Sequence, residues 1–275
     1  MTTFAHAMAN NFFHFKRFSV FQDRCAMKVG TDGVLLGCWS GYDAAAAGSP
    51  TIPHRYHYAR CLDIGTGSGL IALMLAQRFP DAQIDAIDID EAAVEQAAEN
   101  FAASPWSDRL HAFRARLQEW SIVNSQFSIL NSQLYSLIVS NPPYFQNSLK
   151  NPDKGRQTAR HTDTLTYSEL LRHSVRLLDE NGILALVLPA EAEQEICSLA
   201  AQHSLYLTRI TRVYSKDSKP ARRVLLAFEK SKSRNTDIST YRSSENPFTE
   251  DTLVLEDEKG GRSAAYREIT KDFYL

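Results

Sequence analysis

The chain has 275 residues, 44% of them hydrophobic and 23% charged, which suits one large domain with a sizeable core. Its 30 Lys and Arg residues nearly balance 32 Asp and Glu residues, so the net charge of −2 excludes nucleic-acid binding by overall charge. Four scattered cysteines and no apolar run of membrane-spanning length exclude a zinc knuckle and a membrane segment. We therefore expect a cytoplasmic protein, a monomer, without a metal.

The predicted elements divide the chain into four segments. Residues 1–38 are an aromatic and basic extension packed on the core, and the alternation over residues 13–18 predicts one or two strands. Asp32 is a candidate N-cap for the helical stretch that follows. Residues 39–58 are a connector, residues 59–230 are the main domain, and residues 231–275 are a linker followed by a strand (252–256) and a helix (264–273) that extend the same domain.

Within residues 59–230, short apolar runs alternate with segments of helical periodicity. The expected strands are 60–64, 83–89, 110–115, 134–140, 183–188, 205–214 and 222–229, and the expected helices are 70–79, 91–101, 167–178 and 191–203. This alternation predicts an α/β fold, a doubly wound, mostly parallel seven-stranded sheet of the Rossmann-like kind. The last strand is predicted to be antiparallel, because only a short polar loop precedes it. Asn181-Gly182 is predicted to be a turn, and the polar stretches 40–58 and 121–134 are longer than this pattern needs.

A glycine-rich turn follows the first strand of the main domain. Its glycines, which let a backbone turn tightly and approach a ligand closely, are Gly65, Gly67 and Gly69. Asp63 stands just before the turn, where a carboxylate would repel a pyrophosphate but suits a ligand that carries an ammonium and a sulfonium group. Asp88 ends the next strand, where it can accept hydrogen bonds from ribose hydroxyls, and Asp90 is the alternative. This order predicts a site for S-adenosylmethionine.

A second motif, Asn141-Pro142-Pro143-Tyr144, follows the strand at 134–140. The prolines fix the backbone and remove two donors, so the Asn141 side chain and the Pro142 carbonyl remain as acceptors. Two acceptors can grip the N–H groups of an amino nitrogen attached to a planar system, while Tyr144 stacks on its π-face. The motif predicts methylation of such a nitrogen, on adenine or on a glutamine carboxamide, and does not choose between them.

These motifs together resemble class I amino-methyltransferases of the N6-adenine type. More narrowly, the chain resembles the bacterial family that methylates the adenosine beside the anticodon of a valine tRNA. The resemblance rests on residues 13–16 (FHFK), 23–37 (DRCAMKVGTDGVLLG), 61–65, 140–144, 223–228 and 273–275. It implies S-adenosylmethionine as cofactor, tRNA as substrate, and Asn141, Pro142 and Tyr144 at the target base. We also assign Lys28, Thr31 and Ile89, together with Asn141, to the cofactor.

One residue departs from the family pattern. Such enzymes commonly carry an acid after the third strand that contacts the cofactor's adenine, and Arg116 stands there instead. Backbone groups or Gln118 are the expected substitutes.

The expected RNA contacts are basic side chains that follow the Asn-Pro-Pro-Tyr motif or lie near the loop between the strands 205–214 and 222–229, since local positive charge binds phosphates. They are Lys150, Arg156, Arg160, Lys216, Lys219, Arg222 and Arg223.

Three other functions compete with tRNA methylation. A glutamine N5-methyltransferase acting on a release factor shares the Asn-Pro-Pro-Tyr motif. A nicotinamide-dependent oxidoreductase would use Gly67-x-Gly69-x-x-Ala72 as a loose dinucleotide fingerprint, but it leaves that motif unexplained. An RNA-binding module without activity is the third.

Overall fold

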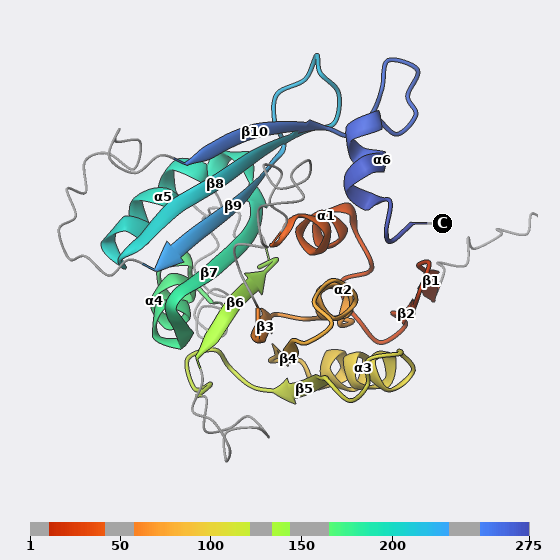
Figure 1. The fold of residues 1–275 in the computed structure, drawn as a ribbon, viewed down its shortest axis with the longest axis vertical. Coiled ribbons are helices and arrows are strands. Elements are labelled where there is room, and N and C mark those ends of the chain that lie inside the picture. The colour runs from red at the N-terminus through yellow and green to blue at the C-terminus, as the bar shows by residue number, and fades with distance from the viewer. Residues whose placement is uncertain (1–10, 42–57, 122–133, 144–164, 231–247, 275) are drawn as a thin grey trace, which may run out of the picture.

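A computed structural model describes residues 11–41, 58–121, 134–143, 165–230 and 248–274, and an eight-stranded sheet forms its centre (Figure 1). The strand order is β10-β8-β9-β7-β6-β3-β4-β5. In chain order the strands are β3 (Arg60–Ile64), β4 (Gln83–Asp88), β5 (Leu110–Arg114), β6 (Tyr135–Ser140), β7 (Leu178–Pro189), β8 (Leu205–Tyr214), β9 (Arg223–Lys230) and β10 (Thr249–Val254). Neighbouring strands are parallel except where β9 pairs, antiparallel, with β7 and with β8.

The seven strands predicted for the main domain are all present, and β9 is the antiparallel one, as predicted. The C-terminal strand β10 joins the same sheet beside β8, so the sheet has eight strands rather than seven. The predicted turn at Asn181-Gly182 is wrong, because β7 begins at Leu178 and continues through it. A bulge in the β6–β7 register lies here, where a Cβ on Gly182 would come within 2.9 Å of the Tyr135 carbonyl oxygen.

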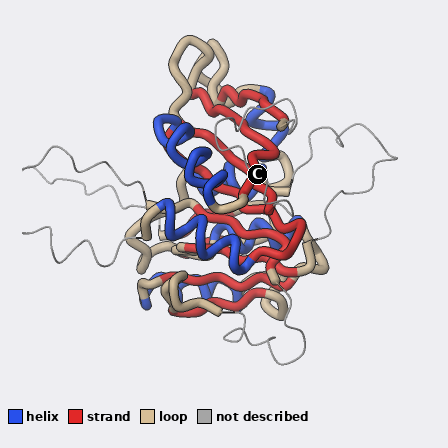
Figure 2. Tube along the Cα trace, turned by 90° about the vertical axis from the view of Figure 1, so that its left-hand side faces the viewer, coloured by secondary structure: helices blue, strands red, loops and turns tan. Residues whose placement is uncertain are grey.

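Helices cover both faces of the sheet (Figures 1 and 2). The helices are α1 (Thr31–Trp39), α2 (Leu70–Arg78), α3 (Glu91–Ala102), α4 (Tyr167–Leu177), α5 (Glu193–Gln202) and α6 (Ala264–Thr270), with a 3₁₀ turn at Ala190–Ala192 before α5. One apolar core lies under α1, α2, α3 and α6, and the other lies under α4 and α5. Among the described residues, no helix is long and apolar enough to cross a membrane.

A small N-terminal hairpin packs against the C-terminal part of the chain. Its strands are β1 (Phe12–His14) and β2 (Ser19–Phe21). The backbone N–H of Lys16 donates to the Phe273 carbonyl at 2.8 Å, and its ammonium donates to the Lys271 carbonyl at 2.6 Å. The rings of Phe15 and Tyr274 stack with their centroids 5.8 Å apart. Segments near the two ends of the chain therefore stabilise one another.

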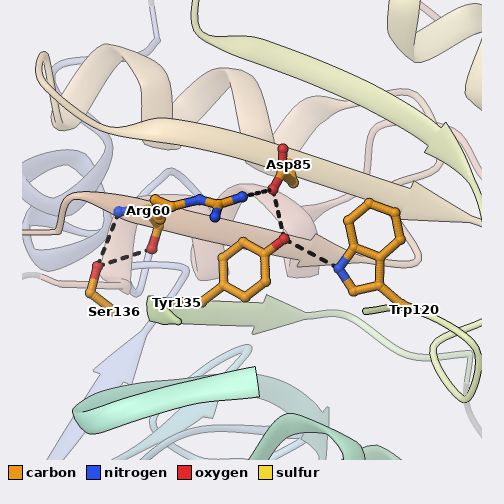
Figure 3. A network of polar contacts seen from close by, with 5 residues as sticks. All are labelled: Arg60, Asp85, Trp120, Tyr135 and Ser136. Atoms are coloured by element: carbon orange, nitrogen blue, oxygen red, sulfur yellow. Dashed lines mark hydrogen bonds and ion pairs between the residues drawn. The ribbon is translucent and has the colours of Figure 1, made fainter. Parts of the chain in front are cut away.

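A buried polar network joins β3, β4 and β6 near their amino-terminal ends (Figure 3). The Asp85 carboxylate oxygen Oδ2 accepts from the Arg60 guanidinium and from the Tyr135 hydroxyl, each at 2.6 Å. The Trp120 indole donates to the Tyr135 oxygen at 3.2 Å, and the Arg60 guanidinium lies 5.0 Å from the centre of the Tyr135 ring. The network fixes the register of these strands at the end of the sheet opposite the glycine turn.

Candidate active site at the carboxyl edge of the sheet

The glycine turn joins the carboxyl end of β3 to the start of α2. Gly65, Gly67 and Gly69 all have positive φ angles, of 72°, 54° and 80°. A Cβ added to Gly65 or Gly67 would meet no atom within 4 Å, so the outer side of the turn has room for a ligand to approach the backbone. The N–H groups of Gly65 and Thr66 donate to the Ile87 carbonyl at 2.9 and 3.1 Å, which fixes the turn to the end of β4.

Asp63 is fully buried beneath this turn. Its Oδ2 accepts from the Thr66 hydroxyl at 2.7 Å and from the Ala72 N–H at 3.2 Å, whereas its Oδ1 is buried without a hydrogen-bond partner among the described residues. Burial raises the pKa of the carboxyl to about 7, the two hydrogen bonds oppose this rise, and the charge of Asp88 adds to it. A neighbouring cation would hold this group in its ionised form.

Asp88 lies at the carboxyl end of β4, beside the same turn. Its Oδ2 accepts from the Gly67 N–H at 2.9 Å, and its Oδ1 accepts from the Asp90 N–H at 3.0 Å. Asp90 is the N-cap of α3 and accepts from the Ala92 N–H at 3.0 Å, so it has a structural role of its own. Between them Ile89 is 51% exposed, which offers an apolar surface next to the glycine turn.

Asn141 follows β6 and lies next to the glycine turn in the sheet. Ser140 pairs in register with Ile64, and its hydroxyl donates to the Ile64 carbonyl at 2.9 Å, so Asn141 and Gly65 leave the sheet side by side. Asn141 is half-buried and Pro142 is buried. Tyr144 lies outside the described residues, as do the predicted RNA contacts Lys150, Arg156 and Arg160.

The N-terminal segment runs along α3 towards the same edge. Asn100 of α3 accepts from the Phe21 N–H at 2.9 Å and donates to the Ser68 carbonyl in the glycine turn at 2.8 Å. Further on, burial raises the pKa of the Cys25 thiol to about 11, and the charges of Asp88, Asp90 and Asp23 contribute to the rise. Lys28 and Thr31 come next and are exposed.

The prediction that Asp32 caps α1 is wrong. The helix begins at Thr31, its N-cap residue is Gly30, and Asp32 lies inside the first turn. Its carboxylate accepts from Arg223 Nε at 2.8 Å, and this ion pair joins α1 to the first residue of β9. The capping pattern was misleading because a short acidic side chain in the first turn suits a helix start whether or not it is the cap.

The other basic side chains lie in or beside the loop that joins β8 to β9. Lys219 and Arg222 are exposed, and Lys216, which follows β8, is 3.5 Å from Glu256. Because β9 runs antiparallel, this loop lies at the same edge as the glycine turn and Asn141.

Of the two residues considered for contact with the cofactor's adenine, Arg116 is half-buried, and Gln118 hydrogen-bonds Glu169 in the first turn of α4. The Gln118 side chain is therefore already held by α4. Within the described ranges, no three His, Cys, Asp or Glu side chains gather as a metal site would require.

Known proteins resemble the chain over almost its whole length. A protein of Bacteroides thetaiotaomicron named tRNA1(Val) (adenine(37)-N6)-methyltransferase is 42% identical over 270 residues, which are 98% of this chain and 99% of that protein. The chain belongs to this methyltransferase family. A relative of the same name from Pectobacterium carotovorum is 40% identical, over 96% of this chain and 93% of that protein. The family model called methyltransferase small domain matches residues 49–203 of this chain.

Solved structures agree on the fold of the methyltransferase. A predicted O-methyltransferase from Agrobacterium tumefaciens superposes with a TM-score of 0.60 at 17% identity, over 88% of this chain and 96% of that one. Family membership makes the chain an S-adenosylmethionine-dependent methyltransferase, so the nicotinamide-dependent oxidoreductase is rejected as a function.

The glycine turn, Asp63 and Asp88 lie close together in the fold, and two contacts beside them were not predicted from the sequence. Thr66 is one, since its hydroxyl fixes the orientation of the buried carboxyl of Asp63. The pair of Asp32 and Arg223 is the other, since nothing in the sequence near either residue points to a partner so far along the chain.

Proposed function

We propose that this methyltransferase transfers the methyl group of S-adenosylmethionine to N6 of adenosine 37 in tRNA1(Val). The observation that supports this most directly is the similarity to proteins of that name over nearly the full chain. The adjacent positions of the glycine turn and Asn141 support it independently, because they place an amino-nitrogen motif next to a cofactor turn.

The residues present fit the cofactor. The open outer side of Gly65 and Gly67 admits its methionine portion, and the unpartnered Oδ1 of Asp63 is a buried acceptor suited to a positively charged group. Asp88 would accept from the ribose hydroxyls, and Ile89 would pack on the adenine ring. When bound, S-adenosylmethionine supplies an electrophilic methyl group attached to sulfur. Lys28 and Thr31 remain our candidates for the carboxylate of the methionine.

Asn141 and Pro142 orient the acceptor nitrogen. The side-chain oxygen of Asn141 and the carbonyl of Pro142 accept the two N–H groups of the adenine amino group, which favours a pyramidal nitrogen with its lone pair directed at the methyl group. Tyr144 stacks on the base. An anticodon-loop base reaches such a site at lower cost than a base in a duplex. No strong general base is needed, because the amino proton becomes acidic only as the methyl group arrives and water then takes it up. The leaving group would be the neutral thioether S-adenosylhomocysteine.

The variant Asn141→Ala tests the assignment. We expect the rate of transfer to a tRNA1(Val) transcript to fall on the order of a hundredfold or more, while the affinity for S-adenosylhomocysteine stays close to wild type. Asn181→Ala is the matched control, because it removes the same kind of side chain at an exposed position to which no role is assigned. Transfer by Asn141→Ala at the wild-type rate would contradict the role of Asn141.

Nucleoside mass spectrometry of tRNA from cells with and without the gene tests the substrate. Loss of N6-methyladenosine supports adenine methylation, and an unchanged profile contradicts it. Labelled cofactor offered with a release factor in place of tRNA tests the carboxamide alternative. We also propose that the protein acts as a monomer in the cytoplasm, in keeping with its four buried free thiols.

A further inference from the structure

The ion pair between Asp32 and Arg223 joins two parts of the site that are 191 residues apart in the chain. Arg223 Nε donates to Asp32 Oδ2 at 2.8 Å, and the side chains are only 30% and 22% exposed. A charge-assisted hydrogen bond from a planar guanidinium is directional, so this contact fixes an orientation as well as a distance.

The Asp32 side of the pair reaches the cofactor turn. Asp32 is in the first turn of α1, and a Cβ added to the next residue, Gly33, would lie 3.2 Å from Leu70, the residue with which α2 begins. The first turns of α1 and α2 are therefore in close contact, directly behind Gly69. Helix α1 therefore packs against the residue that directly follows the cofactor turn.

Arg223 belongs to the hairpin of β8 and β9, whose loop carries basic side chains. Arg223 begins β9, pairs with Pro189 of β7, and ends the loop that carries Lys219 and Arg222. The other end of α1 is also held by this hairpin. The Trp39 indole donates to the Thr211 hydroxyl of β8 at 2.7 Å. Helix α1 and the β8–β9 hairpin are thus connected at both ends of the helix.

We propose that Arg223 is a positioning residue rather than a ligand of RNA phosphate. Through Asp32 it holds the basic β8–β9 loop in register with the cofactor turn, so that a base delivered by RNA bound to that loop meets the methyl group in line. This inference rests on the proposed function and revises the prediction that Arg223 contacts RNA.

The hydrogen bonds of Arg223 support this assignment. Its Nε donates to Asp32, and its Nη1 donates to the Arg222 carbonyl at 2.8 Å. Turning the guanidinium towards a phosphate would break its bond to a carboxylate that is largely covered, which is costly. Arg222 is the natural contrast, because it is adjacent in sequence and exposed.

Salt dependence separates the two roles. Each lost phosphate contact lowers the slope of log affinity against log salt concentration by about 0.7 to 0.9. We would measure tRNA1(Val) binding between 50 and 300 mM salt, together with kcat and KM, for Arg223→Gln, Asp32→Asn, the double variant and the matched control Arg222→Gln.

We expect Arg222→Gln to make the slope shallower by about 0.7 to 0.9, which corresponds to the loss of one phosphate contact. Arg223→Gln and Asp32→Asn should both keep the wild-type slope and lower kcat by about tenfold to a hundredfold, since misplacement of reacting groups is enough for such a loss. The double variant should lose no more than either single variant, because both remove the same interaction. Arg223→Lys, which keeps a cation beside Asp32 but not the planar guanidinium, should recover only part of the kcat.

Thermal melting and S-adenosylhomocysteine binding establish that each variant is folded. Arg223→Met and Asp32→Ser, which also remove the ion pair, replace any variant that is not. The proposal is overturned if Arg223→Gln lowers the salt slope as Arg222→Gln does, or if Asp32→Asn has wild-type kcat. Failure of the proposed function looks different, because the wild-type protein would then not methylate the transcript at all.

Discussion

Replacing Asp63 by Asn should change how the stability of the ligand-free protein depends on pH. Asn keeps an oxygen for the Thr66 hydroxyl and the Ala72 N–H but carries no charge. In the folded wild type, burial raises the pKa of the Asp63 carboxyl from its ordinary 3.8 to about 7, the two hydrogen bonds oppose this, and Asp88 adds to it. Between these pH values the folded protein keeps a proton that the unfolded chain has released.

The free energy of unfolding therefore falls as pH rises through this range and levels off above pH 7. Each pH unit costs about 1.4 kcal/mol well below the folded pKa, so the full contribution is about 4 kcal/mol, of which about 2 kcal/mol is lost between pH 5 and pH 7. Urea unfolding of wild type and Asp63→Asn at half-unit steps of pH isolates this group, because every other titration is common to both proteins. We expect the variant to gain about 2 kcal/mol on the wild type across that interval.

A constant difference between the two proteins from pH 5 to pH 7 would refute the reasoning. Binding of S-adenosylhomocysteine gives a second measurement. A ligand ammonium beside Asp63 would favour the carboxylate, so binding to wild type at pH 6.5 should release a proton, and binding to Asp63→Asn should not. Calorimetry in two buffers of different ionisation enthalpy measures this release directly.

Three further substitutions test the fold around the site. Tyr135→Phe removes the hydroxyl that bonds Asp85 and accepts from Trp120, and should lower the free energy of unfolding by about 1 to 3 kcal/mol in urea denaturation. Gly69→Ala should cost about 1 to 3 kcal/mol more than Gly65→Ala, because both residues have positive φ but only the Cβ at position 69 would meet Phe101, at 2.5 Å. Equal losses at the two glycines would contradict the packing argument.

The parts of the fold that follow from local pattern were predicted from the sequence. Alternating apolar runs and helical segments gave the parallel sheet, and the short loop before Arg223 gave the antiparallel strand. Asp63 and Asp88 could be placed because each ends or nearly ends a strand beside a glycine turn, and strand ends meet at one edge of the sheet.

The features that were missed depend on contacts between distant segments. Arg60 and Asp85 lie in segments whose apolar character predicts buried strands. The residues next to them in the sequence do not indicate that the two form a buried ion pair beside Tyr135. The Asn181-Gly182 pair predicts a turn, because Asn-Gly usually reverses a chain. In the structure the missing side chain of Gly182 instead lets the backbone approach the Tyr135 carbonyl closely. Propensity and periodicity describe a residue's own neighbourhood, so they do not reveal such partners.

The contact between the N-terminal hairpin and the C-terminal segment has a consequence for the order of events during synthesis. Lys16 donates to a carbonyl 255 residues later in the chain. At 5 to 20 residues per second, a ribosome adds that partner about 13 to 51 seconds after Lys16 itself. Throughout that interval Phe15 lacks Tyr274, the ring that later stacks on it. The hairpin can therefore bind α3 through Asn100 early in synthesis, but its contacts with the C-terminal segment form much later.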